Sequence, residues 1–305
     1  MKEYLIVLNK DEDTATIVNL ETRTLEKNIE TDHNPHEVLV SLDKKKTYVT
    51  CSWGNRLNII DNDTFELSKT VSHEDFNFPH GLGLTKDGRK LYLASTFSEK
   101  IFIIDTEDDE IVKVFPTYQK HSHMVAPAPD GKTIYVPNMG SHNITVIDVE
   151  SEEIVNHFPV GKGPEGVAVH PDGKHLYVAN QHDNDLYIID TESLEVLYER
   201  EIGSCPIRIV FSPDGQYAFI PNRESGDISI IETAHNLKGE IRPWEVKRIP
   251  VGNWPGGTAF NHNGSYAYVA NNKTNDVSVI NVKTLKEETR IDVGIHPDGM
   301  TYLRR

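Results

Sequence analysis

One short segment, in which a proline usually stands at the second position, recurs seven times along the 305-residue chain. The copies are NPHEVLVS, FPHGLGLT, HSHMVAPA, GPEGVAVH, CPIRIVFS, WPGGTAFN and HPDGMTYL, and their second residues are Pro35, Pro79, Ser122, Pro164, Pro206, Pro255 and Pro297. The interval between copies is 42 to 44 residues, except for one interval of 49. Seven units of this length predict a circular or solenoid array, because one unit cannot bury its apolar side chains alone.

Each unit contains four short runs with the character of β-strands. In one unit the runs are GVAVH, LYVAN, LYIID and LEVLYEREI, and the first two are joined by the turn Pro171-Asp172-Gly173. Val, Ile and Tyr at period two favour strands, and Asp-Gly pairs favour tight hairpins. No segment has a sustained helical period. The repeat therefore predicts an all-β, seven-bladed β-propeller with four antiparallel strands in each blade.

The two ends of the chain are expected to share one blade. Residues 296–305 supply a single strand, whereas residues 1–31 supply three strands with no inner strand before them. Pairing these segments closes the ring and hides an open sheet edge, so we expect one domain that spans residues 1–305. The interval of 49 residues predicts a longer loop near Thr233 to Trp244, between the third and fourth strands of its blade.

Composition limits the partners of the chain. Asp and Glu number 47 against 31 Lys and Arg, for a net charge of −16, which argues against nucleic acid and anionic membranes. No long apolar run predicts a transmembrane helix, and the start MKEYLIVLNKDED does not resemble a signal peptide. Cys51 and Cys205 cannot form a disulfide framework. We expect a cytoplasmic monomer that acts on a small molecule.

Matched positions in the repeat should form rings around the channel, since the first strand of each blade lines it. The position after the recurring proline, or after Ser122 in one copy, is occupied by His36, His80, His123, Glu165, Ile207, Gly256 and Asp298. Three imidazoles and a carboxylate from consecutive blades would suit a divalent ion such as Zn, Mn, Fe, Co, Ni or Mg. The sequence predicts His36, His80, His123 and Glu165 as metal ligands, and a bound ion there would activate water.

Neighbouring positions offer further catalytic and binding groups. Arg208 is predicted to hold a carboxylate or an oxyanion, and Glu37 is a candidate general base. Asp298 belongs to the same ring as the histidines. His121 and His296 each stand two positions before the ring residue of their own repeat. All three are candidate ligand-binding residues. Two alternatives stay open at this stage: a site that works without metal, and a polar channel lining without chemistry.

The loops between the second and third strands form a predicted rim on the same face, which includes Met139, Gln181 and Arg223 as well as aromatic residues. Trp53, Phe97 and Trp254 could supply an apolar wall for a ligand. Exposed aromatics of this kind also serve as contacts for a protein partner, so a partner on the top face is the alternative.

The repeat resembles that of the YVTN family of β-propeller proteins. The family pattern, PxGVAVxPDGxxLYVANxxxNxVxVID, is nearly intact from Gly163 to Asp190 and recurs more loosely in every unit. The resemblance covers the whole chain and implies a seven-bladed propeller. Such propellers include lactonases, lyases, cofactor-bearing subunits and binding scaffolds.

Part of the ring is also similar to the active site of streptogramin lyases, which are seven-bladed propellers that use magnesium and a histidine base. The similarity rests on Pro35-His36, the loop Cys51-Ser52-Trp53-Gly54 and Pro79-His80-Gly81. It implies that His80 is the base and that His36 is a neighbouring active-site histidine. The lyases carry a glutamate where this chain has Phe78.

Together these patterns predict a metal-dependent hydrolase or lyase that opens a lactone or ester at the top of the channel, with His80, Arg208 and Glu37 as its catalytic residues. The alternative is a scaffold without catalysis that binds a protein or peptide on its top face. A third possibility is a role with a redox cofactor.

Overall fold

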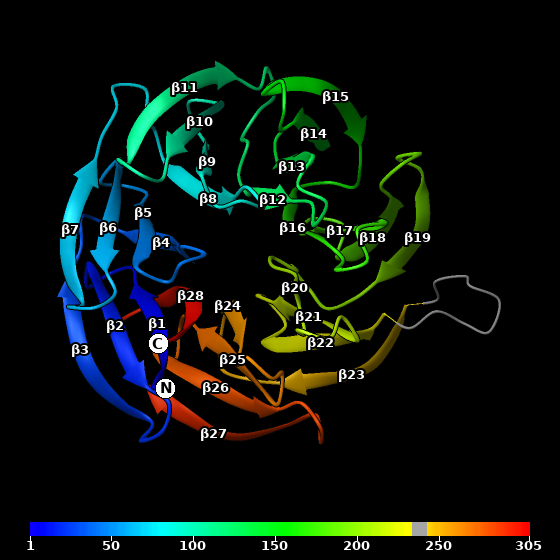
Figure 1. Ribbon diagram of the computed structural model, residues 1–305. Coiled ribbons are helices and arrows are strands. Elements are labelled where there is room, and N and C mark those ends of the chain that lie inside the picture. Colours follow the sequence, from blue (N-terminus) through cyan, green and yellow to red (C-terminus); the bar gives the residue numbers. More distant parts are fainter. Residues whose placement is uncertain (234–242) are drawn as a thin grey trace.

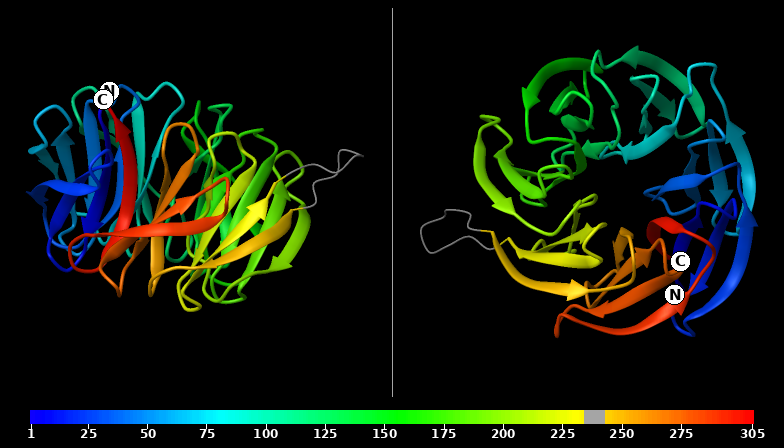
Figure 2. Two further views of the ribbon diagram at one scale, coloured as in Figure 1. Left: turned by 90° about the horizontal axis from the view of Figure 1, so that it is seen from below. Right: turned by 180° about the vertical axis from the view of Figure 1, so that it is seen from behind.

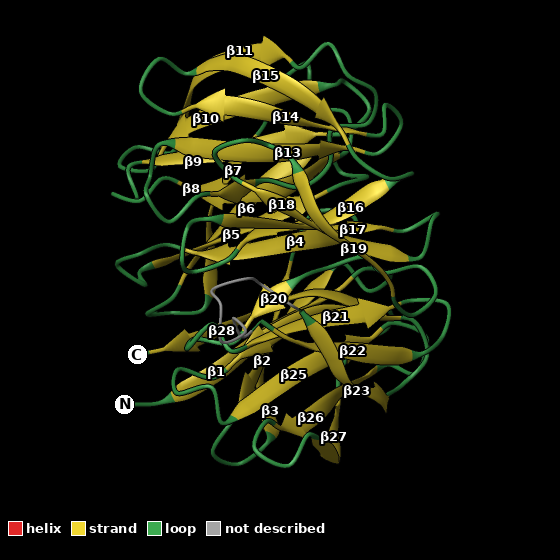
Figure 3. Ribbon diagram, turned by 90° about the vertical axis from the view of Figure 1, so that its right-hand side faces the viewer, coloured by secondary structure: helices red, strands yellow, loops and turns green. Residues whose placement is uncertain are grey.

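The computed structural model of the protein describes residues 1–233 and 243–305 and arranges them as seven four-stranded antiparallel sheets around a central channel (Figure 1). All regular elements in these residues are strands (Figure 3). The predicted fold class is therefore confirmed. Within the same residues, no helix has the length and apolar character that a membrane crossing requires.

The blades are numbered from the first complete one, and each runs from its inner to its outer strand. The strands of blades 1 to 3 are β4 (Pro35–Val40), β5 (Lys46–Cys51), β6 (Arg56–Asp61), β7 (Glu66–Val71); β8 (Pro79–Leu84), β9 (Lys90–Ser95), β10 (Lys100–Asp105), β11 (Glu110–Pro116); β12 (Ala126–Pro127), β13 (Thr133–Asn138), β14 (Asn143–Asp148) and β15 (Glu153–Pro159).

The strands of blades 4 to 6 are β16 (Pro164–Val169), β17 (His175–Asn180), β18 (Asp185–Asp190), β19 (Val196–Glu201); β20 (Val210–Phe211), β21 (Tyr217–Asn222), β22 (Asp227–Glu232), β23 (Trp244–Pro250); β24 (Pro255–Phe260), β25 (Tyr266–Asn271), β26 (Asp276–Asn281) and β27 (Lys286–Asp292). The predicted longer loop lies between β22 and β23, and most of it, residues 234–242, is outside the described residues.

Blade 7 joins the two ends of the chain. Its strands are β28 (Pro297–Arg304), β1 (Glu3–Asn9), β2 (Thr14–Asn19) and β3 (Thr24–Glu30), in that spatial order. The inner strand β28 pairs with β1, and the two termini lie side by side (Figure 2). Lys2 and Arg305 exchange two backbone hydrogen bonds at the end of this pair. The predicted closure of the ring is confirmed.

Burial explains why the middle strands have near-continuous apolar sequences. In β9 and β10 every residue except the first of each strand and the last of β10 is buried, because both faces of these strands pack against neighbouring blades. The outermost strand β27 instead alternates exposed residues with partly buried ones and the buried Ile291. The apolar clusters consequently lie at the seams between blades, and the channel is left for polar side chains.

Glycines allow the inner strands to approach each other closely around the channel. A Cβ atom on Gly257 would lie 2.0 Å from the carbonyl oxygen of Asp298, and one on Gly81 would lie 2.4 Å from that of His123. Gly81 N also donates a hydrogen bond to His123 O across the seam, at 2.8 Å. These glycines bring the residues one position before them, His80 and Gly256, close to their neighbours in the ring.

Candidate functional site

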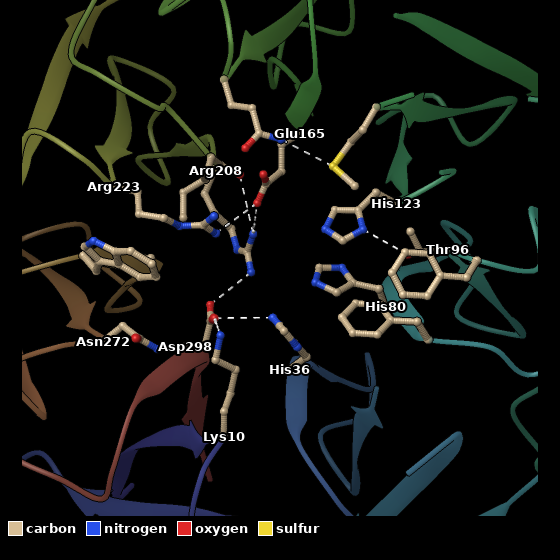
Figure 4. A pocket seen from close by; sticks show the side chains of 17 residues that line it. Lys10, His36, His80, Thr96, His123, Glu165, Arg208, Arg223, Asn272 and Asp298 are labelled. Carbon is tan, nitrogen blue, oxygen red and sulfur yellow. Dashed lines mark hydrogen bonds and ion pairs between the residues drawn. The ribbon is translucent and has the colours of Figure 1, made fainter. Parts of the chain in front are cut away.

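A cavity of about 340 Å³ opens at the top of the channel, and the residues after the recurring proline form its wall (Figure 4). All seven ring positions predicted from the repeat line this cavity: His36, His80, His123, Glu165, Ile207, Gly256 and Asp298. The repeat thus brings side chains from seven blades to one place.

Local backbone geometry directs these side chains into the channel. The residue before the proline position has a positive φ of 55° to 63° in all seven blades: Asn34, Phe78, His121, Gly163, Cys205, Trp254 and His296. The strand pairing then shifts register directly after the proline in five blades, as between Pro35 and Glu37 and between Pro164 and Gly166. A bulge of this kind turns the intervening side chain out of the sheet, so His36 and Glu165 point into the cavity.

Three imidazoles form one side of the cavity. The ring centroids of His36 and His80 lie 4.7 Å apart, and those of His80 and His123 lie 3.6 Å apart with the rings stacked. Burial lowers the pKa of His36 to about 3, with Lys10 and Arg208 adding to the effect and Asp298 opposing it. Burial also holds the pKa values of His80 and His123 well below the usual range. This wall is therefore uncharged at neutral pH.

The three histidines differ in their hydrogen bonds and their access to the cavity. His36 Nδ1 lies 3.1 Å from the side-chain oxygen Oδ1 of Asn34, and His123 Nδ1 lies 3.0 Å from Thr96 Oγ1. The side chain of His36 is 15% exposed, whereas that of His80 is 1% exposed. His80 Nδ1 is buried without a hydrogen-bond partner. His36 is consequently the more accessible proton acceptor.

Cations and carboxylates form the opposite side. The buried guanidinium of Arg208 hydrogen-bonds to Glu37, and its Nη2 lies 3.3 Å from Asp298 Oδ1. Lys10 Nζ lies 2.6 Å from Asp298 Oδ2, and Arg223 also lines the cavity. Burial would raise the pKa of Asp298, but Lys10, His36 and Arg208 together hold it well below its usual value. Asp298 is therefore ionised, and its ion pairs hold Lys10 and Arg208 in place.

Glu37 lies on the far side of Arg208 from the upper cavity. It lines a second cavity of about 140 Å³ lower in the channel, and Arg208 lines both cavities. Its Oε1 is 3.8 Å from His80 Nε2. Burial raises the pKa of Glu37 to about 7, although Arg208 acts to lower it. Glu37 therefore titrates near neutral pH and changes the net charge around Arg208.

The predicted metal ligands do not converge on one point. Glu165 Oε1 lies 3.3 Å from Arg223 Nη2 and 3.7 Å from Arg208 Nη1, and it has taken up ion pairs with these arginines. The rings of His80 and His123 are stacked on each other, and no three of the four predicted ligands offer atoms that all lie within 4.8 Å of one another. The donor set as it lies does not fit a metal ion, and the metal centre stays a prediction from the sequence.

Among residues 1–233 and 243–305, a different group meets the spacing of a metal site. Only His170, Asp172 and His175 have three potential ligand atoms that all lie within 4.8 Å of one another.

The predicted ligand-binding residues separate into two groups. Phe97, Trp254 and Asp298 line the cavity. Trp53, His121 and His296 are not among the lining residues. Trp53 instead contacts Phe78 and Phe97 at ring-centroid distances of 4.9 and 6.1 Å.

The placement of His121 and His296 follows from their backbone. Both have a positive φ at the turn that leads into the inner strand, and the ring position comes two residues later. His296 Nδ1 pairs with Asp11 Oδ2 at 2.6 Å, and the His121 ring packs edge-on against Phe97. The structure thus places both histidines on the rim.

A second ring of lining residues was predicted only in part, as the rim residues Met139, Gln181 and Arg223. The residues of this ring directly follow the second strand of six blades: Lys10, Thr96, Met139, Gln181, Arg223 and Asn272. Aligning the repeats at this position would have found all of them, in the same way as the histidine ring. Lys10, which the sequence reasoning missed, and Arg223 supply two of the three cations of the cavity.

The chain matches the family model described as "Lactonase, 7-bladed beta-propeller" over residues 112–290. No curated protein matches it in sequence.

Several solved structures share the fold. A candidate 6-phosphogluconolactonase from Bacteroides uniformis is 19% identical, with a TM-score of 0.84 and 99% of each chain covered. The periplasmic gluconolactonase PpgL of Pseudomonas aeruginosa is 18% identical, with a TM-score of 0.81, covering 100% of this chain and 99% of that one. Hydrazine synthase of Kuenenia stuttgartiensis is 22% identical, with a TM-score of 0.80 and 90% of each chain covered. At these identities the likeness concerns the fold.

Proposed function

Because the chain belongs to the seven-bladed β-propeller lactonase family, we propose that it hydrolyses the ring ester of a small lactone that carries an anionic group. One observation carries the proposal: three uncharged imidazoles face the cations Lys10, Arg208 and Arg223 across a single cavity. The family match agrees with the lactonase-like resemblance of the repeat. Two of the similar structures are also named for lactonase activity.

The charged residues that line the cavity support an anionic substrate. The chain has a net charge of −16, yet Lys10, Arg208 and Arg223 all line this one cavity. The carboxylates that line it, Asp298 and Glu165, number one fewer than the cations. A carboxylate or phosphate can pair with the guanidinium groups, and such charge-assisted hydrogen bonds are stronger than neutral ones.

His36 is the group best placed to act as general base. Asn34 Oδ1 can only accept a hydrogen bond, so His36 carries its proton on Nδ1 and keeps a lone pair on Nε2. That lone pair faces the cavity beside Asp298. An anionic substrate would offset the nearby Lys10 and Arg208 and thereby raise the pKa of His36 toward the working range. His80, the base implied by the lyase resemblance, is less accessible.

The reaction then needs only the side chains of the cavity. His36 Nε2 takes a proton from water as the water oxygen bonds to the lactone carbonyl carbon, and the carbonyl oxygen becomes an oxyanion beside Arg208. The ring C–O bond breaks, and His36 returns the proton to the departing alkoxide. The product is the open hydroxy acid, and one water is consumed.

A matched pair of lactones tests the proposal. We expect kcat/KM for 6-phosphogluconolactone to exceed that for gluconolactone by about 10-fold or more, since one charge-assisted contact contributes about 1.5–3 kcal/mol. Arg223→Gln should reduce this preference while retaining hydrolysis of the neutral lactone. Turnover of neither lactone above the spontaneous rate would refute the function, and equal turnover of both would refute the anionic preference.

The raised pKa of Glu37 leads us to expect that anion binding depends on pH. When Glu37 ionises near pH 7 it neutralises Arg208, so anions should bind more weakly as the pH rises from about 6 to 8. We expect the inhibition constant of gluconate, whose carboxylate stays ionised over this range, to increase across it. Glu37→Gln keeps the size of the side chain but removes the titration, and its profile should be flat. A wild-type slope that persists in Glu37→Gln would show that another group is responsible.

A further inference from the structure

The hairpin between β16 and β17 gathers two histidines around one carboxylate oxygen. Asp172 Oδ2 lies 3.1 Å from His170 Nδ1 and 2.8 Å from His175 Nδ1. β16 begins at the cavity, which Glu165 lines, and ends at Val169, so the hairpin lies at the opposite end of the inner strand. This group is therefore separate from the candidate active site.

The other blades show which part of this hairpin the fold itself requires. At the position of His170 three of them have a hydroxyl that donates to an aspartate Oδ1 two residues later, at 2.6 Å in each: Ser41 to Asp43, Thr85 to Asp87 and Ser212 to Asp214. The position of His175 is occupied by Lys46 in blade 1 and Lys90 in blade 2. The aspartate is thus a feature of the turn, whereas the two histidines are particular to blade 4.

The two carboxylate oxygens of Asp172 have different roles. Oδ1 accepts a hydrogen bond from Lys174 N at 2.7 Å, as the equivalent Asp43 Oδ1 does from Lys45 N at 3.0 Å. Oδ2 faces the two imidazoles instead. The turn is therefore satisfied by one oxygen, and the other is directed at the histidines.

The ring of His170 is held in the orientation that a metal ligand needs. Its Nε2 lies 3.0 Å from the backbone oxygen of Gly215 in blade 5 and must donate to it, which leaves a lone pair on Nδ1. That lone pair now accepts a hydrogen bond from Asp172 N at 3.2 Å. Phe211 packs edge-on against the ring at a centroid distance of 5.0 Å. A carbonyl that accepts the second N–H is the usual support of a metal-bound histidine.

We propose that His170 Nδ1, His175 Nδ1 and Asp172 Oδ2 bind one divalent transition-metal ion, with zinc as the best chemical match. Zinc bonds to nitrogen and oxygen ligands are about 2.0–2.2 Å long, which places neighbouring ligand atoms about 3.3–3.6 Å apart in a tetrahedral site. The distances from Asp172 Oδ2 to His170 Nδ1 and His175 Nδ1, 3.1 and 2.8 Å, are slightly shorter, so only small side-chain shifts are needed to admit the ion. Binding moves the proton of His175 from Nδ1 to Nε2, and water completes the coordination. The ion would fasten the hairpin of blade 4 to blade 5 through His170 and Gly215.

Zinc titration of the full chain, stripped with EDTA, tests this site by calorimetry. We expect the wild-type chain to bind zinc, and His170→Ser and His175→Lys to lower the affinity of that site at least about 10-fold. Both substitutions introduce residues that other blades carry at the same places, so the variants should fold. Zinc should also raise the thermal midpoint of the wild-type chain but not of these variants.

His36→Gln and His123→Gln are the matched controls, because these histidines belong to the cavity at the other end of the channel. They should leave the zinc affinity of the hairpin unchanged. Zinc binding that is lost in these controls and kept in His175→Lys would overturn the proposal and support the metal centre predicted from the sequence. No zinc binding by the wild-type chain would overturn both.

Discussion

His36→Gln is expected to lower kcat for lactone hydrolysis by about 10²–10⁴-fold, which is the contribution of a positioned general base. Glutamine keeps a polar side chain beside Asn34 but offers no nitrogen lone pair where His36 Nε2 faces the cavity. Because His36 is partly exposed in the cavity and the substitution leaves no large void, the thermal midpoint should change little. Rates at saturating substrate, after subtraction of spontaneous hydrolysis, measure the effect.

His80→Gln is the control for the choice between the two histidines. The lyase resemblance makes His80 the base, whereas the accessibility of the rings favours His36. We expect the loss of kcat to be larger in His36→Gln than in His80→Gln. The reverse order would assign proton transfer to His80.

Arg208→Ala should abolish measurable activity and destabilise the fold by about 3–5 kcal/mol, the usual consequence of removing one partner from a buried ion pair. Arg208 is buried and lies within ion-pair distance of Glu37, Asp298 and Glu165. Without it these carboxylates face one another with less positive charge between them. Denaturant unfolding gives the stability, and the lactone assay gives the activity.

Two further variants separate the electrostatic effect from a simple loss of volume. Arg223→Ala removes a more exposed arginine whose only ion pair within residues 1–233 and 243–305 is the one with Glu165, so its loss of stability should be smaller. In Arg208→Ala the pKa of Glu37 rises further, because the cation that lowered it is gone, so this buried carboxyl group must take up a proton when the chain folds at neutral pH. Adding Glu37→Gln removes that cost and should recover part of the lost stability. No recovery in the double variant would mean that packing, and not charge, explains the cost.

The repeat made the architecture predictable in detail. A period of 42 to 44 residues with Asp-Gly turns determines where each strand begins and which blade contains it. The unequal ends of the chain predict the shared blade, because β28 has no other edge to pair with than that of β1. The same logic predicts that His36, His80 and His123 stand at one level, since equivalent residues of a ring occupy equivalent places.

The contacts of Glu165 were less predictable. Sequence position puts it in the ring beside the histidines, but its carboxylate pairs with Arg208 and Arg223, which come from other positions of the repeat. The position of Lys10 against Asp298 likewise depends on a contact between the two ends of the chain. Such pairings depend on which long side chains reach across the channel, and the period says nothing about that.

The sequence by itself determined the number of blades, the closure of the ring and the set of residues that surround the channel, because a repeating backbone places matched residues alike. Only the tertiary structure decided which of them are charged, which are stacked and which are accessible. Burial and the summed charges of several blades set the ionisation of His36, Glu37 and Asp298, and these fields arise only when distant segments meet.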